Sequence, residues 1–349
     1  MKKYFIINFL LMAILFVSCY KSEKYENSSS FSFKDFNITV TLNATIIEFD
    51  EPIMQPLLFV KSDSLLIVQN IRTSKMLYVY NVNTRKKVGE FISWGSGPED
   101  LLRIKNIQLV DSNLYIADNQ KRSMYIYDIS DFRKSTNNPI PIQKTVIDDF
   151  FSNLAYTGNG YVATTMNPND KRLVFYDLMG EREFSSGEYP YFGKDFSEIE
   201  KIEGFLSTIA VSHKHKRIYL FGMNTDLIEI YDFQGKLIKR VHGPDQVFPQ
   251  THEINLQNGA YKVSTGKSKF TFYSPTIIDD EIYVSYSGKL QKIGEEFPLI
   301  QKIFIFDMDC NPIRNYELSK PIVSFTVDPE TKQIFATSNV PEYHLVVFE

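Results

Sequence analysis

Residues that often catalyse reactions or bind metals occur in this chain, but their spacing completes no known site. His213 and His215 would point to the same side of a strand and could share a metal ion, yet the basic residues around them disfavour a bound cation. His252 and Glu253 lack the second histidine of a zinc-binding helix. The sequence therefore predicts no metal site at these histidines.

Two glycine-containing segments match catalytic motifs only in part. Gly259 to Ser268 ends in Gly-Lys-Ser, but Tyr261 stands where a phosphate-binding loop needs its first glycine. Ser96 lies between two glycines, but Trp94 stands where the Gly-x-Ser-x-Gly motif of hydrolases begins. We therefore predict no catalytic residue and no cofactor from these motifs.

Other residues are better suited to binding than to catalysis. The loop from Trp94 to Asp100 contains the only tryptophan of the chain, a second loop runs from His242 to Asp245, and several turns carry a cation. The candidate ligand-binding residues in these segments are Arg72, Trp94, Glu99, Arg122, Lys171, His242 and Asp245. Glycine and proline also suit purely structural loops, and cations at turns are commonly just solvated, so both interpretations stay open.

These loops would converge only if the strands that carry them form a ring, and a repeated pattern indicates one. Six strands of alternating apolar and aromatic residues end in an acid or amide, at Tyr78–Asn81, Tyr125–Asp128, Val174–Asp177, Glu229–Asp232, Ile305–Asp307 and Val347–Glu349. They recur roughly 40 to 55 residues apart, with one longer gap, and a second strand precedes each. The pattern predicts an all-β fold, a six-bladed β-propeller with four-stranded antiparallel blades.

The two ends of the chain are expected to close this ring together. The last repeat ends at Glu349 on its third strand, and Ile38 to Phe49 has the alternation and length to supply the fourth. Pairing the ends would remove exposed edge strands. Residues 244–272 form an insert in the longer gap, and this insert is too short for the four strands of a seventh blade.

The start of the chain resembles a lipoprotein signal peptide. Lys2 and Lys3 precede an apolar run that is too short to span a bilayer comfortably. Phe16-Val17-Ser18-Cys19 resembles a lipobox, which predicts that residues 1–18 are removed and that Cys19 is lipidated. Residues 19–35 are polar and lack an apolar period, so we expect a flexible tether there, followed by a single domain over residues 36–349.

The second repeat carries a family resemblance. Its Gly-x-Gly-Pro loop, the strand Leu114–Asn119 that contains Ala-Asp, and the basic residue before the strand Tyr125–Asp128 together resemble an NHL repeat. With the lipoprotein-like start, the whole chain resembles the TolB-like, NHL-related six-bladed propeller lipoproteins of Bacteroidota. This resemblance implies the architecture, whereas the members of that family share no single function.

Composition and charge fit a large apolar core and exclude some partners. Apolar residues make up 43% of the chain and aromatic residues 14%, which favours extensive burial. Loss of Lys2 and Lys3 from 38 basic residues leaves 36 against 42 acidic ones, a net charge of −6. We therefore expect no nucleic-acid partner. Cys310 has no disulfide partner once Cys19 is acylated, and we expect a monomer.

The sequence leaves two classes of function. The first is a non-catalytic binding or scaffold module of the bacterial cell envelope, lipid-anchored at the outer membrane, which binds a protein, peptide or glycan through the channel face. The alternative is a metal-dependent hydrolase or lyase of the gluconolactonase-like propeller type, which would hold a divalent cation in the channel. We favour the first class, because no catalytic constellation is present and the alternative depends on fold analogy alone.

Overall fold

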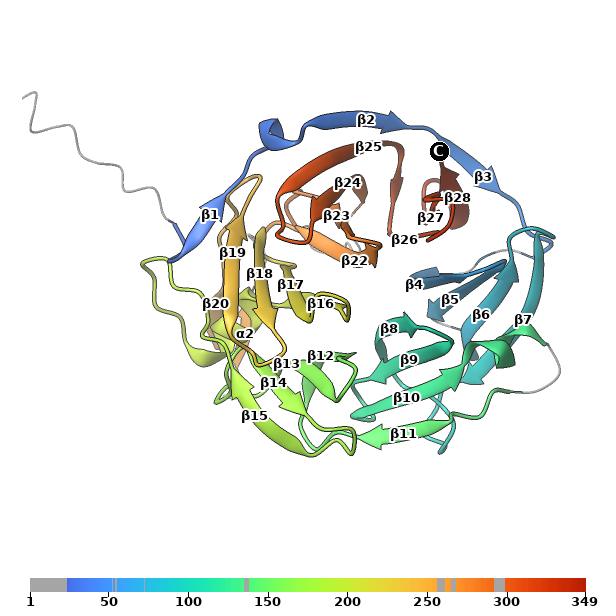
Figure 1. The fold of residues 1–349 in the computed structure, drawn as a ribbon, viewed down its shortest axis with the longest axis horizontal. Helices are drawn as coiled ribbons and strands as arrows, with labels where there is room; N and C mark the ends of the chain where they lie inside the picture. Colours follow the sequence, from blue (N-terminus) through green and yellow to red (C-terminus); the bar gives the residue numbers. More distant parts are fainter. Residues whose placement is uncertain are drawn as a thin grey trace, which may run out of the picture.

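Six β-sheets of four or five strands surround a central axis in the computed structural model of the chain (Figure 1). The structure describes residues 24–349 except 52, 54, 72, 135–137, 256–260, 265–267 and 292–298, and it leaves the side chains of residues 252–267 undescribed. Within each sheet, strands that follow one another in the sequence are antiparallel neighbours that lead from the axis to the rim. The predicted six-bladed β-propeller is confirmed.

The first three blades each contain four consecutive strands. Blade 1 comprises β4 (Gln55–Ser62), β5 (Leu65–Ile71), β6 (Lys75–Asn81) and β7 (Lys86–Ser93). Blade 2 comprises β8 (Ile104–Val110), β9 (Asn113–Asp118), β10 (Ser123–Asp128) and β11 (Gln143–Val146). Blade 3 comprises β12 (Phe151–Tyr156), β13 (Tyr161–Thr165), β14 (Leu173–Tyr176) and β15 (Arg182–Ser186).

The other three blades also take up strands from the N-terminal segment. Blade 4 comprises β16 (Ser207–Ser212), β17 (Arg217–Gly222), β18 (Leu227–Asp232), β19 (Leu237–His242) and the outer β1 (Ser28–Ser30). Blade 5 comprises β22 (Phe272–Ile278), β23 (Glu281–Tyr286), β24 (Ile300–Asp307), β25 (Pro312–Ile322) and the outer β2 (Ile38–Leu42). Blade 6 comprises β26 (Ser324–Val327), β27 (Ile334–Ser338), β28 (His344–Phe348) and β3 (Ala44–Ile47). Blades 4 and 5 thus have five strands where four were predicted.

Short elements fill the connections between these strands. They are the 3-10 helices η1 (Phe33–Asp35) and η2 (Ile129–Arg133), the helix α2 (Glu198–Gly204), and a two-stranded sheet of β20 (His252–Asn255) and β21 (Tyr261–Ser264). This small sheet lies within the insert of residues 244–272. In the described ranges, no helix has both the length and the apolarity needed to cross a membrane.

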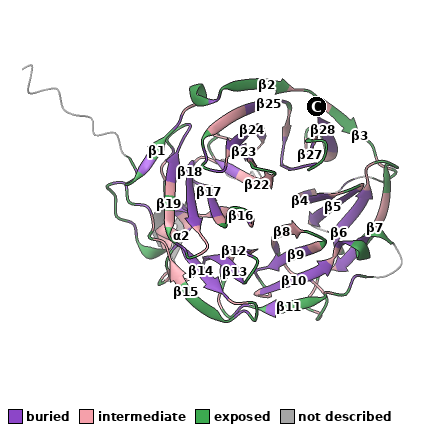
Figure 2. Ribbon diagram, viewed as in Figure 1, coloured by how far each residue is buried: buried purple, intermediate pink, exposed green. Residues whose placement is uncertain are grey.

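The second strand of each blade is buried on both faces, because a neighbouring blade covers each side. In β5, Leu66 packs with Phe335 of blade 6, whereas the next residue, Ile67, packs with Ile116 of blade 2. Figure 2 shows the second and third strands of the blades as largely buried and the rim as largely exposed. The core is therefore a set of apolar layers between blades rather than a single central cluster.

The N-terminal segment runs around the outside of blades 4, 5 and 6 (Figure 1). β3 pairs antiparallel with β28, so the predicted closure of the ring is correct for Ala44–Ile47. The prediction is wrong for Ile38–Leu42, which pairs in parallel with β25 of the preceding blade. Alternation identifies these residues as strand, but it does not distinguish the two partner sheets.

Residues 24–35 belong to the folded domain, which corrects the prediction of a flexible tether up to residue 35. Tyr25 is only 1% exposed, Ser28–Ser30 pairs in parallel with β19, and the Phe31 ring lies 5.4 Å from that of Phe306. A few isolated aromatic side chains pack against the blades and hold this otherwise polar segment in place. The polar composition of the segment gave no sign of this packing in the sequence. Residues 19–23 lie outside the described part of the chain.

The path of the chain gives the propeller two different faces. The connections between blades and the turns between second and third strands lie on one side, which we name the crossover face. The turns between first and second strands lie on the other side, which we name the opposite face. These assignments follow from the antiparallel order of strands in every blade.

Candidate ligand site in the central channel

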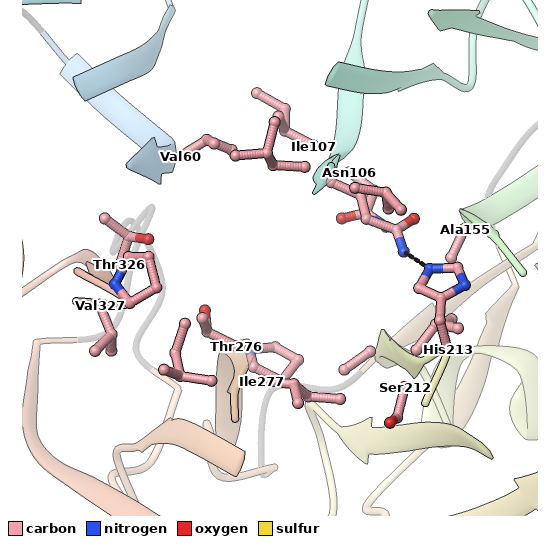
Figure 3. Close-up of a pocket in the computed structure, with 18 of the residues that line it drawn as sticks. Val60, Asn106, Ile107, Ala155, Ser212, His213, Thr276, Ile277, Thr326 and Val327 are labelled. Atoms are coloured by element: carbon pink, nitrogen blue, oxygen red, sulfur yellow. Dashed lines mark hydrogen bonds between the residues drawn. The ribbon is translucent and has the colours of Figure 1, made fainter. Parts of the chain in front are cut away.

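The first strands of the six blades enclose a pocket of about 490 Å³ in the central channel (Figure 3). Its wall includes residues from β4, β8, β12, β16, β22 and β26. The lining continues into the turns that follow these strands, at Asp111, His213, Asp279 and Pro329. The pocket therefore lies toward the opposite face of the propeller and away from the crossover face.

Aliphatic side chains from different blades form a ring in the wall of this pocket. Figure 3 shows Val60 of blade 1, Ile107 of blade 2, Ala155 of blade 3, Ile277 of blade 5 and Val327 of blade 6 around the channel. Such residues are common in strands, and Val60, Ala155 and Val327 are buried between blades, whereas Ile107 and Ile277 are only half-buried. Ile107 and Ile277 thus give part of the wall an apolar surface, and burial of an apolar group against this part is favourable.

Polar residues interrupt the ring on one side. The Gln108 amide donates to the Tyr156 carbonyl oxygen at 3.3 Å and accepts from the Tyr156 backbone N–H at 3.0 Å. Gln108 Nε2 also lies 3.3 Å from His213 Nε2. Because both contacts with Tyr156 fix the orientation of the amide, its second N–H points to the imidazole, and His213 Nε2 must accept.

The pKa of His213 is lowered from its ordinary value. Burial disfavours the charged imidazolium and outweighs the opposite effects of the Thr157 backbone and the Asp111 carboxylate. The contact with Gln108 also disfavours the charged imidazolium, because a protonated His213 Nε2 would place its N–H against the N–H of the Gln108 amide. The channel wall therefore contains a neutral imidazole at neutral pH.

A buried ion pair lies at the other side of the pocket. Lys61 Nζ and Asp328 Oδ2 are 2.9 Å apart, and both side chains are largely buried. Burial alone would raise the pKa of Asp328, but hydrogen bonds from Lys61 and from backbone N–H groups hold that pKa below its usual value. The Lys61 charge is therefore balanced by a carboxylate of the protein itself.

Comparisons with known proteins agree with this architecture. A family model described as TolB-like 6-blade propeller-like matches residues 32–330. The chain belongs to this TolB-like family. A search among curated proteins found no match.

Two solved structures from Bacteroides resemble this TolB-like propeller. A member of the DUF4221 family from Bacteroides vulgatus ATCC 8482 is 8% identical, with a TM-score of 0.54 over 89% of this chain and 96% of its own. A protein from Bacteroides fragilis NCTC 9343 is 12% identical, with a TM-score of 0.53 over 92% of this chain and 98% of its own. At such low identity the likeness concerns the fold alone.

Four of the predicted binding residues of this TolB-like protein lie in loops of the crossover face. Trp94 is 63% exposed, and Glu99 and Lys171 are exposed as well. The Arg122 guanidinium lies 5.2 Å from the centre of the Phe150 ring. None of these four residues lines the channel pocket, and Arg72 lies outside the described residues.

The loop from His242 to Asp245 differs from the prediction. His242 is fully buried, with Nε2 2.8 Å from Asp226 Oδ1, so it is a core residue and not part of an accessible binding face. Asp245 is exposed and accepts a hydrogen bond from the Tyr286 hydroxyl at 2.9 Å. The structure thus explains this loop largely by packing and local hydrogen bonds.

The two nearby histidines do not share the side of a strand, which corrects a further prediction. Both follow the end of β16 in a turn, where His213 faces Gln108 and His215 Nε2 lies 2.7 Å from Asp280 Oδ1. Within the described residues, no three His, Cys, Asp or Glu side chains are placed to hold a metal ion together. Cys310 is buried and has a free thiol.

Sequence reasoning missed the polar residues of the channel. Asn106 and Gln108 alternate with apolar residues in β8, and this alternation was the available signal. An amide at every second position of an innermost strand points to the channel or to the next blade. Without knowledge of the ring, the same pattern indicates only an ordinary half-exposed strand.

Proposed function

We propose that the domain is a non-catalytic binding module that receives an apolar side chain of a peptide or protein loop in the channel pocket. The half-buried Ile107 and Ile277 in the pocket wall are the observation that supports this most strongly, since contact with them would remove such a side chain from water. A volume of about 490 Å³ falls within the range of small-ligand sites and is ample for one side chain.

Polar groups beside the ring would orient the ligand. Asn106 lies on one side of the channel and can form hydrogen bonds with a peptide backbone, whereas the imidazole nitrogens of His213 already face Gln108 and the Thr157 backbone (Figure 3). The Lys61–Asp328 pair leaves no net charge on the other side. A neutral, apolar peptide segment therefore matches the pocket better than an acidic one, and no observation on the described residues favours the metal-dependent hydrolase or lyase.

The same proposal includes an anchor in the cell envelope. A lipid on Cys19 would hold the domain at the outer membrane, which the apolar run before Cys19 and its lipobox-like residues support. Cys19→Ser should release the protein from washed membranes and abolish incorporation of labelled fatty acid. Retention of the variant in membranes after a high-salt wash would exclude the anchor.

A peptide library separates the channel from the crossover face. We would select peptides with residues 24–349, then measure each against Ile107→Trp, which places a large ring in the channel wall, and against Trp94→Ala. Selected peptides should lose at least about tenfold in affinity to Ile107→Trp and bind Trp94→Ala normally. Ile46→Trp on the outer strand β3 is the matched control, because Ile46 is exposed on the rim.

Three results bear on this proposal. Peptides that share an apolar residue and lose affinity only in Ile107→Trp support it. Peptides that bind Ile107→Trp normally but lose affinity for Trp94→Ala would place the ligand on the crossover face and contradict the proposal. Equal thermal unfolding of Ile107→Trp and Ile46→Trp would show that loss of binding does not come from loss of folding.

A further inference from the structure

The described part of the chain begins on the crossover face. Tyr25 packs among aromatic residues of two connections between blades, with its ring centre 5.2 Å from that of Phe192 and 4.8 Å from that of Phe248. The Glu26 backbone N–H donates to the Tyr191 carbonyl oxygen at 3.0 Å. Anything attached before residue 24 therefore leaves the domain from this face, beside blade 4.

The chain between the proposed lipid and this fixed point is short. Six peptide units separate Cys19 from Tyr25, and fully extended they span no more than about 20 Å. A tether of residues 19–35 would have allowed almost any orientation of the domain. With Tyr25 buried, the anchor instead confines one region of the crossover face to the neighbourhood of the membrane.

The crossover face also carries exposed apolar side chains that suit a lipid surface. Trp94 and Phe150 are each 63% exposed and Tyr191 is 44% exposed, and all three lie in connections between blades. Exposed apolar residues in turns between second and third strands add to them, at Met166, Leu290 and Val340. Tryptophan and tyrosine favour the interface between lipid and water because their rings are amphipathic.

Electrostatic attraction to anionic lipid does not favour contact between the crossover face and a membrane. The connection of residues 187–206 contains five acidic residues and two lysines, and Lys171 is paired with Glu188. Anionic lipid would therefore gain little at the point where the chain leaves the domain. Exposed apolar residues also lie in turns between third and fourth strands on the opposite face, at Ile140, Leu178 and Met179, so the short tether is the feature that selects the crossover face. The charge of the lipid should matter little.

We propose that the crossover face lies against the lipid surface, with Trp94, Phe150 and Tyr191 at the interface and the channel pocket facing away. This inference rests on the proposed anchor at Cys19. It also deepens the proposed function, because a pocket on the far face stays open to a ligand outside the membrane.

Trp94 is the only tryptophan and supplies a native probe. The full lipidated chain would be reconstituted in phosphatidylcholine vesicles with and without bromine on the acyl chains, since bromine quenches a nearby indole. We expect Trp94 emission to fall at least about twofold in the brominated vesicles. The double variant Trp94→Phe, Lys214→Trp places the probe on the opposite face and should show almost no quenching.

Two further variants test the cause of the orientation. An insertion of about 20 Gly and Ser residues after residue 22 lengthens the tether and should reduce the quenching of Trp94. Phe150→Ser combined with Tyr191→Ser should reduce it as well, whereas Ile38→Ser on the rim should not. Replacement of part of the phosphatidylcholine by phosphatidylglycerol should leave the quenching unchanged.

The outcomes separate the anchor from the orientation. A lipidated protein that floats with the vesicles can yet show no quenching of Trp94, or show equal quenching at positions 94 and 214. Either result contradicts the proposed orientation but is compatible with the anchor at Cys19. A purified chain without lipid on Cys19, judged by the mass of its N-terminal peptide, overturns both. Quenching of Trp94 alone, reduced by the longer tether, supports the orientation.

Discussion

The Tyr25 hydroxyl lies 2.9 Å from the Thr225 hydroxyl, although 200 residues separate them in the sequence. The contact joins the first described residues of the chain to a turn of blade 4. The pKa of Tyr25 is raised well above its usual range, chiefly by burial. The N-terminal segment is therefore fastened at Tyr25 as well as through the strands β1, β2 and β3.

Tyr25→Ala should destabilise the domain by about 3–5 kcal/mol, because it removes a buried ring from an aromatic cluster. Tyr25→Phe should cost only about 1 kcal/mol, since it removes the hydrogen bond and leaves the ring. Urea denaturation of residues 24–349 measures both. The exposed Lys34→Ala is the control, and equal effects of Tyr25→Ala and Lys34→Ala would contradict the fastening.

The repeated acid that indicated the blades has a clear structural cause. Asp177, Asp232 and Asp307 each accept hydrogen bonds from backbone N–H groups of the following turn, between third and fourth strands. A pattern that serves local backbone geometry can be read from sequence, because donor and acceptor lie within a few residues. This is why the number and order of blades could be predicted.

Contacts between distant segments could not be predicted in the same way. Tyr25 stands among polar residues, and the cluster that buries it forms only when the connection between blades 3 and 4 has packed beside blade 4. Gln108 and His213 meet across two blades, so neither residue indicates the other in the sequence. Trp94 was recognised as a candidate from its glycine-flanked loop, but its position relative to the pocket depends on the direction of the strands.

A buried ion cluster supports blade 4. Glu229 is 1% exposed and lies 2.8 Å from Arg172 Nε and 3.0 Å from Arg240 Nε. Glu229→Gln should cost about 3–5 kcal/mol of unfolding free energy, since two buried guanidinium groups would lose their counter-charge. Glu188→Gln is the matched control, because Glu188 is exposed at the surface.

The contribution of this ion cluster to stability should depend on pH in the acid range. Burial alone would raise the pKa of Glu229, but Arg172 and Arg240 hold it below its ordinary value of 4.5. A carboxyl whose pKa is lowered by folding stabilises the protein above its unfolded pKa and loses this contribution as pH falls further. The stability gap between wild type and Glu229→Gln should therefore narrow below about pH 4.5, and a constant gap down to pH 3 would contradict the lowered pKa.

Trp94→Ala should change the unfolding free energy by no more than about 0.5 kcal/mol, because the ring is 63% exposed. Phe91 lies three residues earlier, is buried in the core between blades, and is the matched comparison. Phe91→Ala should cost about 3–5 kcal/mol. Thermal and urea unfolding of the two variants tests this directly, and a Trp94→Ala loss close to that of Phe91→Ala would show that the indole is part of the core.

The imidazole in the channel should make the domain less stable in mild acid. The pKa of His213 is lowered in the folded state, chiefly by burial, so the unfolded chain binds a proton more readily than the folded one. Stability should therefore be unaffected above the ordinary histidine pKa of 6.5 and should fall as the pH drops below it. His213→Gln removes the titrating group, so the variant should lose less stability than wild type between pH 7 and pH 5.

A second variant tests whether the neighbouring amide contributes to this effect. Gln108→Leu removes the N–H that faces His213 Nε2, so protonation of the imidazole should become easier and the pKa of His213 should rise toward its ordinary value. The pKa can be followed by NMR titration of the imidazole protons in wild type and variant. If His213 titrates at the same pH in both proteins, burial alone sets its pKa and the amide does not hold the imidazole neutral.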